Sequence, residues 1–191
     1  MKGGVAVVAW TRQNALVLKE LEANGSFICR EQFLRAKSDT ISDYYIQAYR
    51  WLTDQSKKQI TIPDGLYLPI WLALTEEARL PEAAGEVSLT VDVPDEHLFI
   101  IDYNKWGYVL NYMYVPTDDD DERAHDKKLR DAGIVNEASL IMSDKGNIFP
   151  QYKSEIIRSW PRCCTPSDDM QNNVGCAWEI RDEWIIDKEI Y

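Results

Sequence analysis

Two segments of the chain carry the hydrophobic spacing of β-strands. Apolar and polar residues alternate without a break over residues 87–93, which predicts a strand with one face in the core and one in water. Residues 5–10 are apolar at nearly every position, which predicts a central strand that is covered on both faces and ends at Thr11 and Arg12. Shorter apolar runs predict further strands at residues 69–74, 98–101 and 174–180, and a last apolar run follows at residues 184–186.

Other segments carry a helical spacing of apolar residues. Residues 14–24 form an amphipathic pattern followed by Gly25, a residue typical of helix C-termini. The clearest helix follows the polar stretch 38–43. Asp102 is a candidate N-cap of a further helix, and residues 154–160 predict a short one. The stripe of the clearest helix consists of Ile41, Tyr45, Ala48 and Leu52, and that of the helix after Asp102 of Trp106, Val109, Leu110 and Met113.

The interspersed helices and strands favour an α+β fold with a mixed, partly antiparallel sheet and packed helices. We expect one domain over residues 1–191, with an acidic helical excursion at about residues 117–150. Within it, Asp118–Glu122 begins a helix whose later half is basic, an order that suits the helix dipole. This helix is predicted to be solvated, and a divalent-cation site at its acidic start is left open.

The composition excludes some classes of protein. Of the 191 residues 45% are apolar, enough for a core, and 21 basic against 32 acidic residues give a net charge of −11. Backbone binding to nucleic acid needs clustered Lys and Arg, so generic nucleic-acid binding is disfavoured. The longest apolar run is too short to span a membrane. An acidic surface centred on Asp118–Glu122 could instead dock on a basic partner.

The reactive residue types form no familiar motif. Four cysteines show no metal-binding spacing, no metal is expected, and two histidines stand in unrelated segments. Phosphate-loop and nucleophile motifs are absent from the sequence. We therefore expect a cytoplasmic protein with reduced thiols, with a redox pair at Cys163 and Cys164 as the alternative.

Aromatic residues are the unusual feature of the composition. Trp71, Trp106 and Trp178 each fall within an apolar pattern, which favours packing in the core over binding of a ligand. The tyrosines at positions 44, 45 and 49 cannot all face the core from adjacent turns of one helix. A ligand-facing role is therefore left open for them.

Six segments of the chain form a distinctive set, namely Trp10-Thr11, residues 48–51 with Gln55, residues 69–71, residues 93–102, residues 106–111 and residues 177–180. Together they resemble a bacterial family of unknown function, domain of unknown function 3841. Gly107 stands where that family usually has His, and the acidic stretch after Pro116 is long, which puts in doubt any activity that depends on the His. The resemblance implies a bacterial or phage protein but no activity.

The outline of these segments is similar, more distantly, to diverged ADP-ribosyltransferase-like domains. That resemblance implies NAD as cofactor and Glu179 as the catalytic carboxylate, which would stabilise the positive charge that builds on the ribose. Arg12 would bind the pyrophosphate, Thr11 a ribose hydroxyl, and Tyr45 or Tyr49 would stack on the nicotinamide. The rival hypothesis is a non-enzymatic acidic binding or inhibitor protein, and the oligomeric state is left open.

Overall fold

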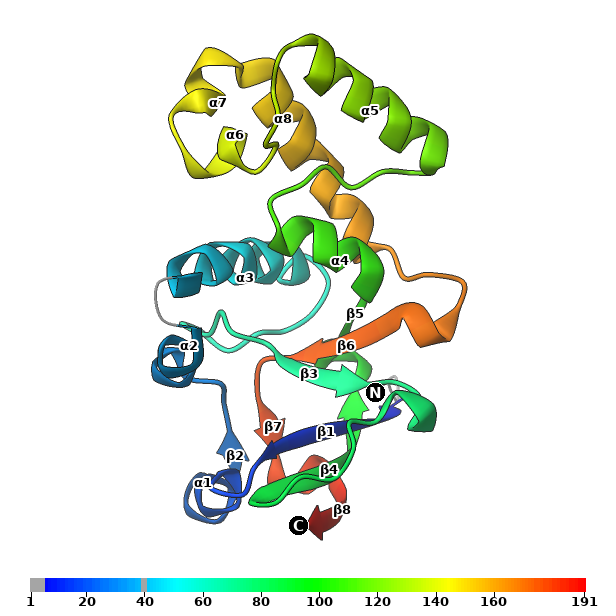
Figure 1. Ribbon diagram of the computed structural model, residues 1–191. Coiled ribbons are helices and arrows are strands. Elements are labelled where there is room, and N and C mark those ends of the chain that lie inside the picture. The colour runs from blue at the N-terminus through cyan, green and yellow to red at the C-terminus, as the bar shows by residue number, and fades with distance from the viewer. Residues whose placement is uncertain (1–5, 39–40) are drawn as a thin grey trace. The chain divides into compact units, whose positions relative to one another are not determined.

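We describe the protein from a computed structural model, whose described residues are 6–38 and 41–191 (Figure 1). The chain divides into two compact units, and each is treated by itself. Unit 1 comprises residues 1–101 and 167–191, and unit 2 comprises residues 102–166. Helices and strands are combined in the chain, which confirms the α+β class expected from the sequence.

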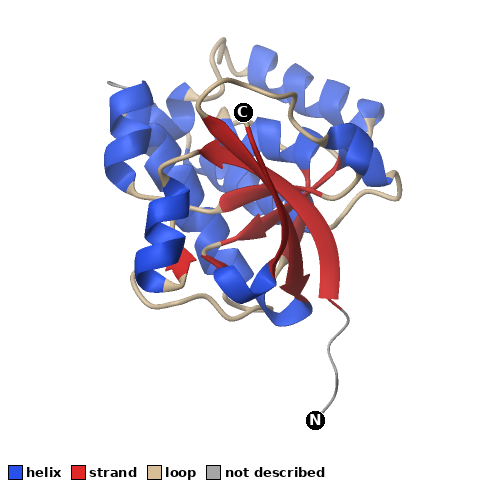
Figure 2. Ribbon diagram, turned by 90° about the horizontal axis from the view of Figure 1, so that it is seen from below, coloured by secondary structure: helices blue, strands red, loops and turns tan. Residues whose placement is uncertain are grey.

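The main sheet belongs to unit 1 and has, over the described residues, the strand order β5-β6-β3-β1-β4-β8. The pairings β1–β3, β1–β4, β3–β6 and β4–β8 are antiparallel, and Figure 2 shows the twist of the strands. The strands are β1 (Ala6–Asn14), β3 (Ile70–Ala73), β4 (Glu86–Pro94), β5 (Phe99–Asp102), β6 (Asn173–Ala177) and β8 (Ile185–Ile190).

β1 is longer than the sequence predicts. It does not end at Thr11 and Arg12, because it pairs with β4 residue by residue as far as Asn14, which lies opposite Glu86. The backbone N–H and C=O groups of this extension find partners on β4 and keep the chain extended. The expectation that the strand is covered on both faces is wrong, because Val8 is 44% exposed.

β4 organises the core of unit 1. The four apolar residues of its alternating pattern are fully buried, as predicted. Its polar face is less open than predicted: Asp92 is exposed, but Ser88 is only 5% exposed. Arg12 and Glu189 flank Ser88 on the neighbouring strands and share its face. The core cluster also includes residues of α1 (Val17–Asn24), β2 (Ser26–Phe27), β3 and β7 (Ile180–Arg181).

α1 ends at a glycine, as the sequence predicts. Gly25 adopts the left-handed conformation with φ 71°, and its N–H donates to the carbonyl of Leu21 at 2.8 Å. The helix begins at Val17 rather than at Asn14. The Asn14 side chain accepts a hydrogen bond from the N–H of Leu16 at 3.0 Å, which holds a turn before the helix.

α3 (Ser42–Ser56) is the aromatic helix that the sequence predicts. Two members of its predicted stripe are buried, but Ile41 is 46% exposed because it precedes the first turn of the helix. Ile46 is buried in place of Tyr45, which is half-buried. The period is therefore correct and the buried face is rotated by about one residue. α2 (Glu31–Ser38), a polar helix before α3, was not predicted.

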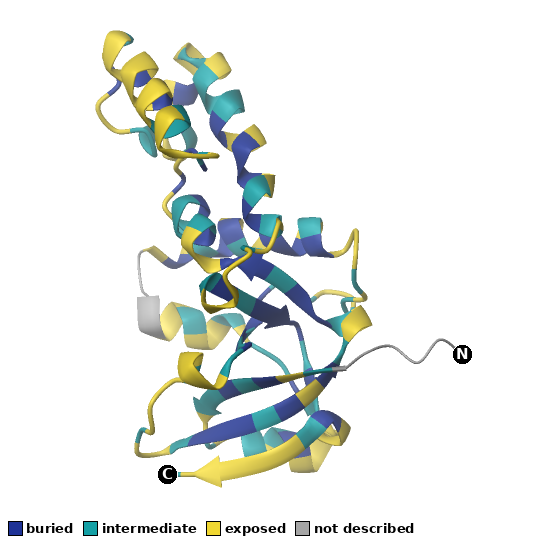
Figure 3. Cartoon of the chain, turned by 90° about the vertical axis from the view of Figure 1, so that its right-hand side faces the viewer, coloured by how far each residue is buried: buried dark blue, intermediate teal, exposed yellow. Residues whose placement is uncertain are grey.

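The segment predicted as one strand at residues 174–180 is two strands in different sheets. β6 ends at Ala177, and β7 pairs with β2 in a small second sheet. Trp178 and Glu179 lie between the two strands. After β7 a short 3-10 helix (Asp182–Trp184) leads into β8, which is mostly exposed near the C-terminus (Figure 3). The mostly apolar residues 174–180 gave no sign of this break.

Unit 2 is helical in its described residues. Asp102 caps α4, as predicted, by accepting a hydrogen bond from the N–H of Lys105 at 3.1 Å. Trp106 and Val109 are buried, but Met113 lies beyond the helix and is 38% exposed. The elements are α4 (Tyr103–Leu110), α5 (Asp119–Asp131), α6 (Ser139–Met142), α7 (Lys145–Ile148), α8 (Pro150–Ser159) and a 3-10 helix (Trp160–Cys164).

Two helices of unit 2 differ from their predictions in detail. α5 begins after the N-cap Asp118, whose carboxylate accepts from the N–H of Asp121 at 2.9 Å. It is not wholly solvated, because His125 and Leu129 are buried. α8 begins earlier than residue 154, since Pro150 suits the first turn of a helix, where its missing N–H costs nothing.

Some predicted features fall outside the described residues, namely Val5 of the first strand and Asp39 and Thr40 of the stretch before α3. Within residues 6–38 and 41–191, no helix combines the length and the apolar character needed to cross a membrane. Further short 3-10 helices occur at Glu76–Ala78, Asp95–His97 and Met170–Asn172.

Candidate functional site

Glu179, the predicted catalytic residue, lies in the short segment between β6 and β7. Arg181 donates to one carboxylate oxygen, Oε1, from Nε at 2.9 Å and from Nη2 at 2.6 Å. The Glu179 side chain is 14% exposed, so the carboxylate is fixed and partly withdrawn from water. Its other oxygen, Oε2, has no hydrogen-bond partner in the described part of the chain.

The preceding residue ties this segment to α3. Trp178 is 2% exposed, and its indole N–H donates to the hydroxyl of Thr53 at 2.9 Å. The Thr53 hydroxyl lies 2.8 Å from the carbonyl oxygen of Tyr49, to which it donates. A buried chain of hydrogen bonds therefore connects the segment that carries Glu179 with the aromatic helix.

Tyr45 and Tyr49 lie one turn apart on α3, and both are half-buried. The ring of Tyr49 lies 6.2 Å from that of Trp71 on β3, at an interplanar angle of 54°. Burial raises the pKa of Tyr49 to about 12, so its phenol stays neutral at physiological pH. Tyr49 therefore has an aromatic packing partner, and Trp71 is only half-buried, unlike Trp106 and Trp178.

Thr11 and Arg12 are consecutive on β1, so their side chains point to opposite faces of the sheet. Trp10 of β1 pairs with Ala73 of β3. Opposed residues of antiparallel strands share a face, so Arg12 lies on the face that carries Trp71. Thr11 lies on the other face, which the apolar core lines.

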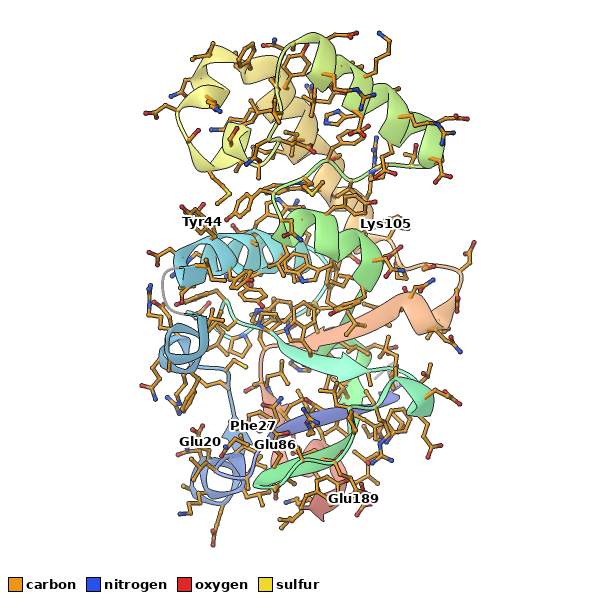
Figure 4. The ribbon with its side chains drawn as sticks, in the orientation of Figure 1. Glu20, Phe27, Tyr44, Glu86, Lys105 and Glu189 are labelled. Carbon is orange, nitrogen blue, oxygen red and sulfur yellow. The ribbon has the colours of Figure 1, made fainter. Side chains whose placement is uncertain are left out.

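Thr11 and Arg12 both already have polar partners in the protein. Thr11 is 4% exposed, and its hydroxyl accepts from Nε2 of Gln13 at 2.9 Å. Nε of Arg12 lies 2.5 Å from Oε2 of Glu86 at the start of β4 (Figure 4), and the guanidinium also donates to the carbonyl of Pro81. The structure thus places Arg12 and the Tyr49–Trp71 pair on one face of the sheet and leaves Thr11 apart.

The acidic residues 118–122 fall into two groups: Asp121 and Glu122 accept side-chain hydrogen bonds within unit 2, and the three residues before them are exposed. Asp121 accepts from the Thr117 N–H at 2.9 Å, the Tyr114 hydroxyl at 2.9 Å and Arg162 at 3.1 Å. The backbone hydrogen bond from Thr117 contributes most to lowering the pKa of Asp121. Glu122 accepts from a tyrosine hydroxyl. The three preceding aspartates, residues 118–120, are exposed.

A cluster of buried polar groups in unit 2 was not predicted. His125 is 3% exposed, and its ring stacks on that of Tyr114 at 4.1 Å and 9°. Its Nε2 lies 3.0 Å from a carboxylate oxygen of Glu137, and its Nδ1 lies 3.6 Å from Glu155. Lys128 donates to the same Glu155 oxygen at 2.8 Å.

The charges of this cluster support one another. Burial disfavours the charged form of His125, but the hydrogen bond and the negative charge of Glu137, together with the charge of Glu155, outweigh it and raise the pKa of His125. Burial also acts against the Glu155 carboxylate, yet Lys128 and His125 lower its pKa. The cluster therefore shifts His125 toward its protonated form and Glu155 toward its ionised form.

One signal in the sequence pointed to this cluster. His125 and Leu129 are four residues apart, a spacing that places both on the same side of a helix. The strongly charged composition of residues 117–133 outweighed that pair and led to the prediction of a solvated helix. Glu137 and Glu155 reach the cluster from distant segments, which single-sequence patterns do not show.

Two pockets of the structure lie in unit 2, and neither is lined by a predicted site residue. One, of about 380 Å³, is polar, and the other, of about 460 Å³, is more apolar. Across the described ranges no group of His, Cys, Asp and Glu side chains is arranged to hold a metal ion. The sulfurs of Cys163 and Cys164 lie 3.9 Å apart and are not joined in a disulfide bond.

Comparison of the chain with models of protein families gives a match. The model of a family described as a domain of unknown function (DUF3841) matches residues 8–186. The expected similarity to ADP-ribosyltransferases finds no support in these comparisons. No curated protein and no solved structure matches the chain.

Proposed function

Because the chain belongs to the DUF3841 family, whose description assigns no activity, we propose from the geometry that it is an NAD-using enzyme that transfers ADP-ribose. The observation that carries this proposal is the state of Glu179. Its carboxylate is held through one oxygen by Arg181, is 14% exposed, and follows a tryptophan bonded to the aromatic helix. A fixed, partly desolvated carboxylate is the group that a developing sugar cation needs.

The proposed reaction breaks the bond between the ribose C1′ and the nicotinamide nitrogen. Nicotinamide leaves with the bonding electrons, and positive charge builds on C1′ and the ring oxygen. Oε2 of Glu179, which has no partner in the described structure, is the oxygen available to face that charge. The acceptor forms the new bond to C1′ and gives its proton to solvent, so atoms and charge balance.

Other predicted residues have different parts in the proposal. Arg12 lies on the same face as the Tyr49–Trp71 pair and would exchange Glu86 for the pyrophosphate of NAD. Tyr45, half-buried one turn from Tyr49, would stack on the nicotinamide. Thr11 points to the opposite face, so the ribose contact expected from it is not included in the site.

The test is nicotinamide release from NAD by the wild type and by Glu179→Gln. We expect release to fall about 100-fold or more in the variant, the loss typical when one charge-stabilising group is removed. The matched control is Glu183→Gln, because Glu183 is exposed and lies 3.8 Å from the same arginine. Equal release by wild type and Glu179→Gln, with both folded, contradicts the proposal.

The exposed aspartates of α5 favour a second candidate function, docking on a basic partner. Asp118, Asp119 and Asp120 are exposed, and Asp120 makes only a surface ion pair, with Arg123. We expect a lysine-rich peptide to bind at low salt and to be released at about 0.5 M salt, because exposed charges are then screened. The variant Asp119→Asn/Asp120→Asn keeps the cap Asp118 and should lose this binding. Binding that the variant retains argues against docking.

A further inference from the structure

The polar pocket of unit 2 is rich in positive charge although the chain is strongly acidic. Its volume is about 380 Å³, within the range of small-molecule sites. Three cationic side chains and one carboxylate line it, from α5, α8 and the 3-10 helix after α8. The lining residues are Tyr114, Lys128, Glu155, Arg158, Ser159 and Arg162.

Two of the cations are held in place by the protein. Nη1 of Arg162 donates to the carbonyl of Val115 at 2.5 Å and to Asp121 at 3.1 Å, and its guanidinium lies 5.0 Å from the centre of the Tyr114 ring. Both of these hydrogen bonds come from Nη1. Lys128 is anchored by its hydrogen bond to Glu155. The cations are therefore oriented before any ligand arrives.

Arg158 differs from the other two cations. It lies in the last turn of α8 and lines the pocket, and within the described ranges its guanidinium has no hydrogen-bond or ion-pair partner. An arginine fork presents planar, paired donors that match the oxygens of phosphate or carboxylate. Arg158 is thus the donor group in this pocket that a ligand can engage without breaking an internal contact.

The hydroxyl groups of Ser159 and Tyr114, which line the pocket, already have hydrogen-bond partners. Ser159 donates to the carbonyl of Ile156 at 2.6 Å and accepts from the N–H of Val115 at 2.8 Å. The Tyr114 hydroxyl donates to Asp121. The donors that remain open belong to the cationic side chains, so a ligand that fits must be rich in acceptors and negatively charged.

We propose that this pocket binds the phosphate group of a small phosphate monoester. Lys128 pairs with Glu155 and Arg162 pairs with Asp121, so the uncompensated positive charge of the pocket is that of Arg158. A phosphate monoester carries about −1.5 to −2 charges at neutral pH and can accept hydrogen bonds from several of these cationic groups at once. A phosphate group offers three acceptor oxygens to these donors, whereas a carboxylate offers two. The volume of the pocket allows a small organic group beside the phosphate. All lining residues belong to unit 2, so this inference is independent of the proposed role of Glu179.

The test is calorimetric titration of the full chain with ribose phosphate, inorganic phosphate and ribose at constant ionic strength. We expect ribose phosphate to bind more tightly than inorganic phosphate, and ribose not to bind. Arg158→Gln should weaken the binding of ribose phosphate about tenfold or more, the effect of losing hydrogen bonds to a charged group. The affinity of Arg158→Lys for ribose phosphate should lie between those of the wild type and Arg158→Gln. Lysine keeps the positive charge but lacks the paired donors of the guanidinium.

The matched control is Arg123→Gln, an exposed arginine of α5 that pairs with Asp120 away from the pocket lining. It should bind ribose phosphate as the wild type does. Equal weakening by Arg123→Gln and Arg158→Gln, or no binding of either phosphate at millimolar concentration, overturns the site. Equal affinity for inorganic phosphate and ribose phosphate overturns the assignment of an ester. Glu179→Gln should leave the titration unchanged, which separates this inference from the NAD proposal.

Discussion

The two units are stabilised by different kinds of interior. In unit 1 the side chains that face inward from β4 are all apolar and fully buried, and they belong to one core cluster with apolar residues of α1, β2, β3 and β7. In unit 2 the buried His125 is enclosed by Tyr114, Glu137 and Glu155, so ionisable groups occupy part of its interior. Unit 1 therefore depends mainly on apolar burial, which is insensitive to pH, and unit 2 depends in part on charge.

The two units should therefore tolerate different substitutions without loss of the fold. An apolar core tolerates surface changes and responds to lost volume. A buried ionic network responds to the removal of any one partner, because the partners left behind remain desolvated. Substitutions chosen from the two interiors should therefore separate the two kinds of stabilisation.

The largest effect is expected in the apolar interior of unit 1. Leu89 is fully buried at the centre of β4, and Leu89→Ala should lower the free energy of unfolding by about 2–5 kcal/mol through lost burial and a cavity. Urea denaturation followed by circular dichroism measures this. The control Ile186→Ala, at a side chain that is 58% exposed, should change stability by less than about 0.5 kcal/mol. A similar loss in both variants would contradict an interior dominated by burial.

The fold of unit 1 was largely predictable because its strongest signals are local. The strict alternation of residues 87–93 identified β4, and the glycine after α1 identified the end of that helix. The extension of β1 and the break between β6 and β7 were missed because both depend on pairing with distant strands. Strand pairing is a tertiary property that a local pattern does not contain.

The candidate site could be predicted only as residue types and not as an arrangement. The sequence suggested Glu179 and Arg12 as site residues. It contained no sign that Arg181 binds the Glu179 carboxylate or that Glu86 forms an ion pair with Arg12. Thr11 and Arg12 were assigned to one ligand although neighbours on a strand face opposite ways, a rule that the sequence alone already allowed. The polar pocket of unit 2 was missed because its cations come from separate elements.

A smaller and pH-dependent effect is expected in unit 2. His125→Phe should lower the free energy of unfolding by about 1–3 kcal/mol, because Glu137 loses a buried hydrogen-bond donor. The pKa of His125 is raised in the folded state, so its contribution is fully present below the unfolded value of 6.5 and is lost as pH rises through the folded value. The variant should therefore lose more stability at about pH 6 than at about pH 8.

Urea denaturation of wild type and variant at both pH values measures that difference directly. The control is Lys127→Gln, an exposed side chain on the same helix that pairs with Asp131 at the surface. Its small effect should be the same at both pH values. If His125→Phe lowers the free energy of unfolding as much at about pH 8 as at about pH 6, the imidazole stabilises unit 2 only by packing against Tyr114 and not by its charge.

The smallest effect is expected at the helix cap that begins the acidic run. The Asp118 carboxylate accepts from the N–H of Asp121, and Asp118→Ala should lower the free energy of unfolding by about 0.5–2 kcal/mol. Asp119→Ala is the matched control, since Asp119 lies at the start of the same helix, is exposed and caps no N–H. Both variants lose one negative charge near the positive end of the helix dipole, worth about 0.3–1 kcal/mol. A larger loss in Asp118→Ala than in Asp119→Ala, by urea denaturation, therefore isolates the cap, whereas equal losses would assign the whole effect to charge.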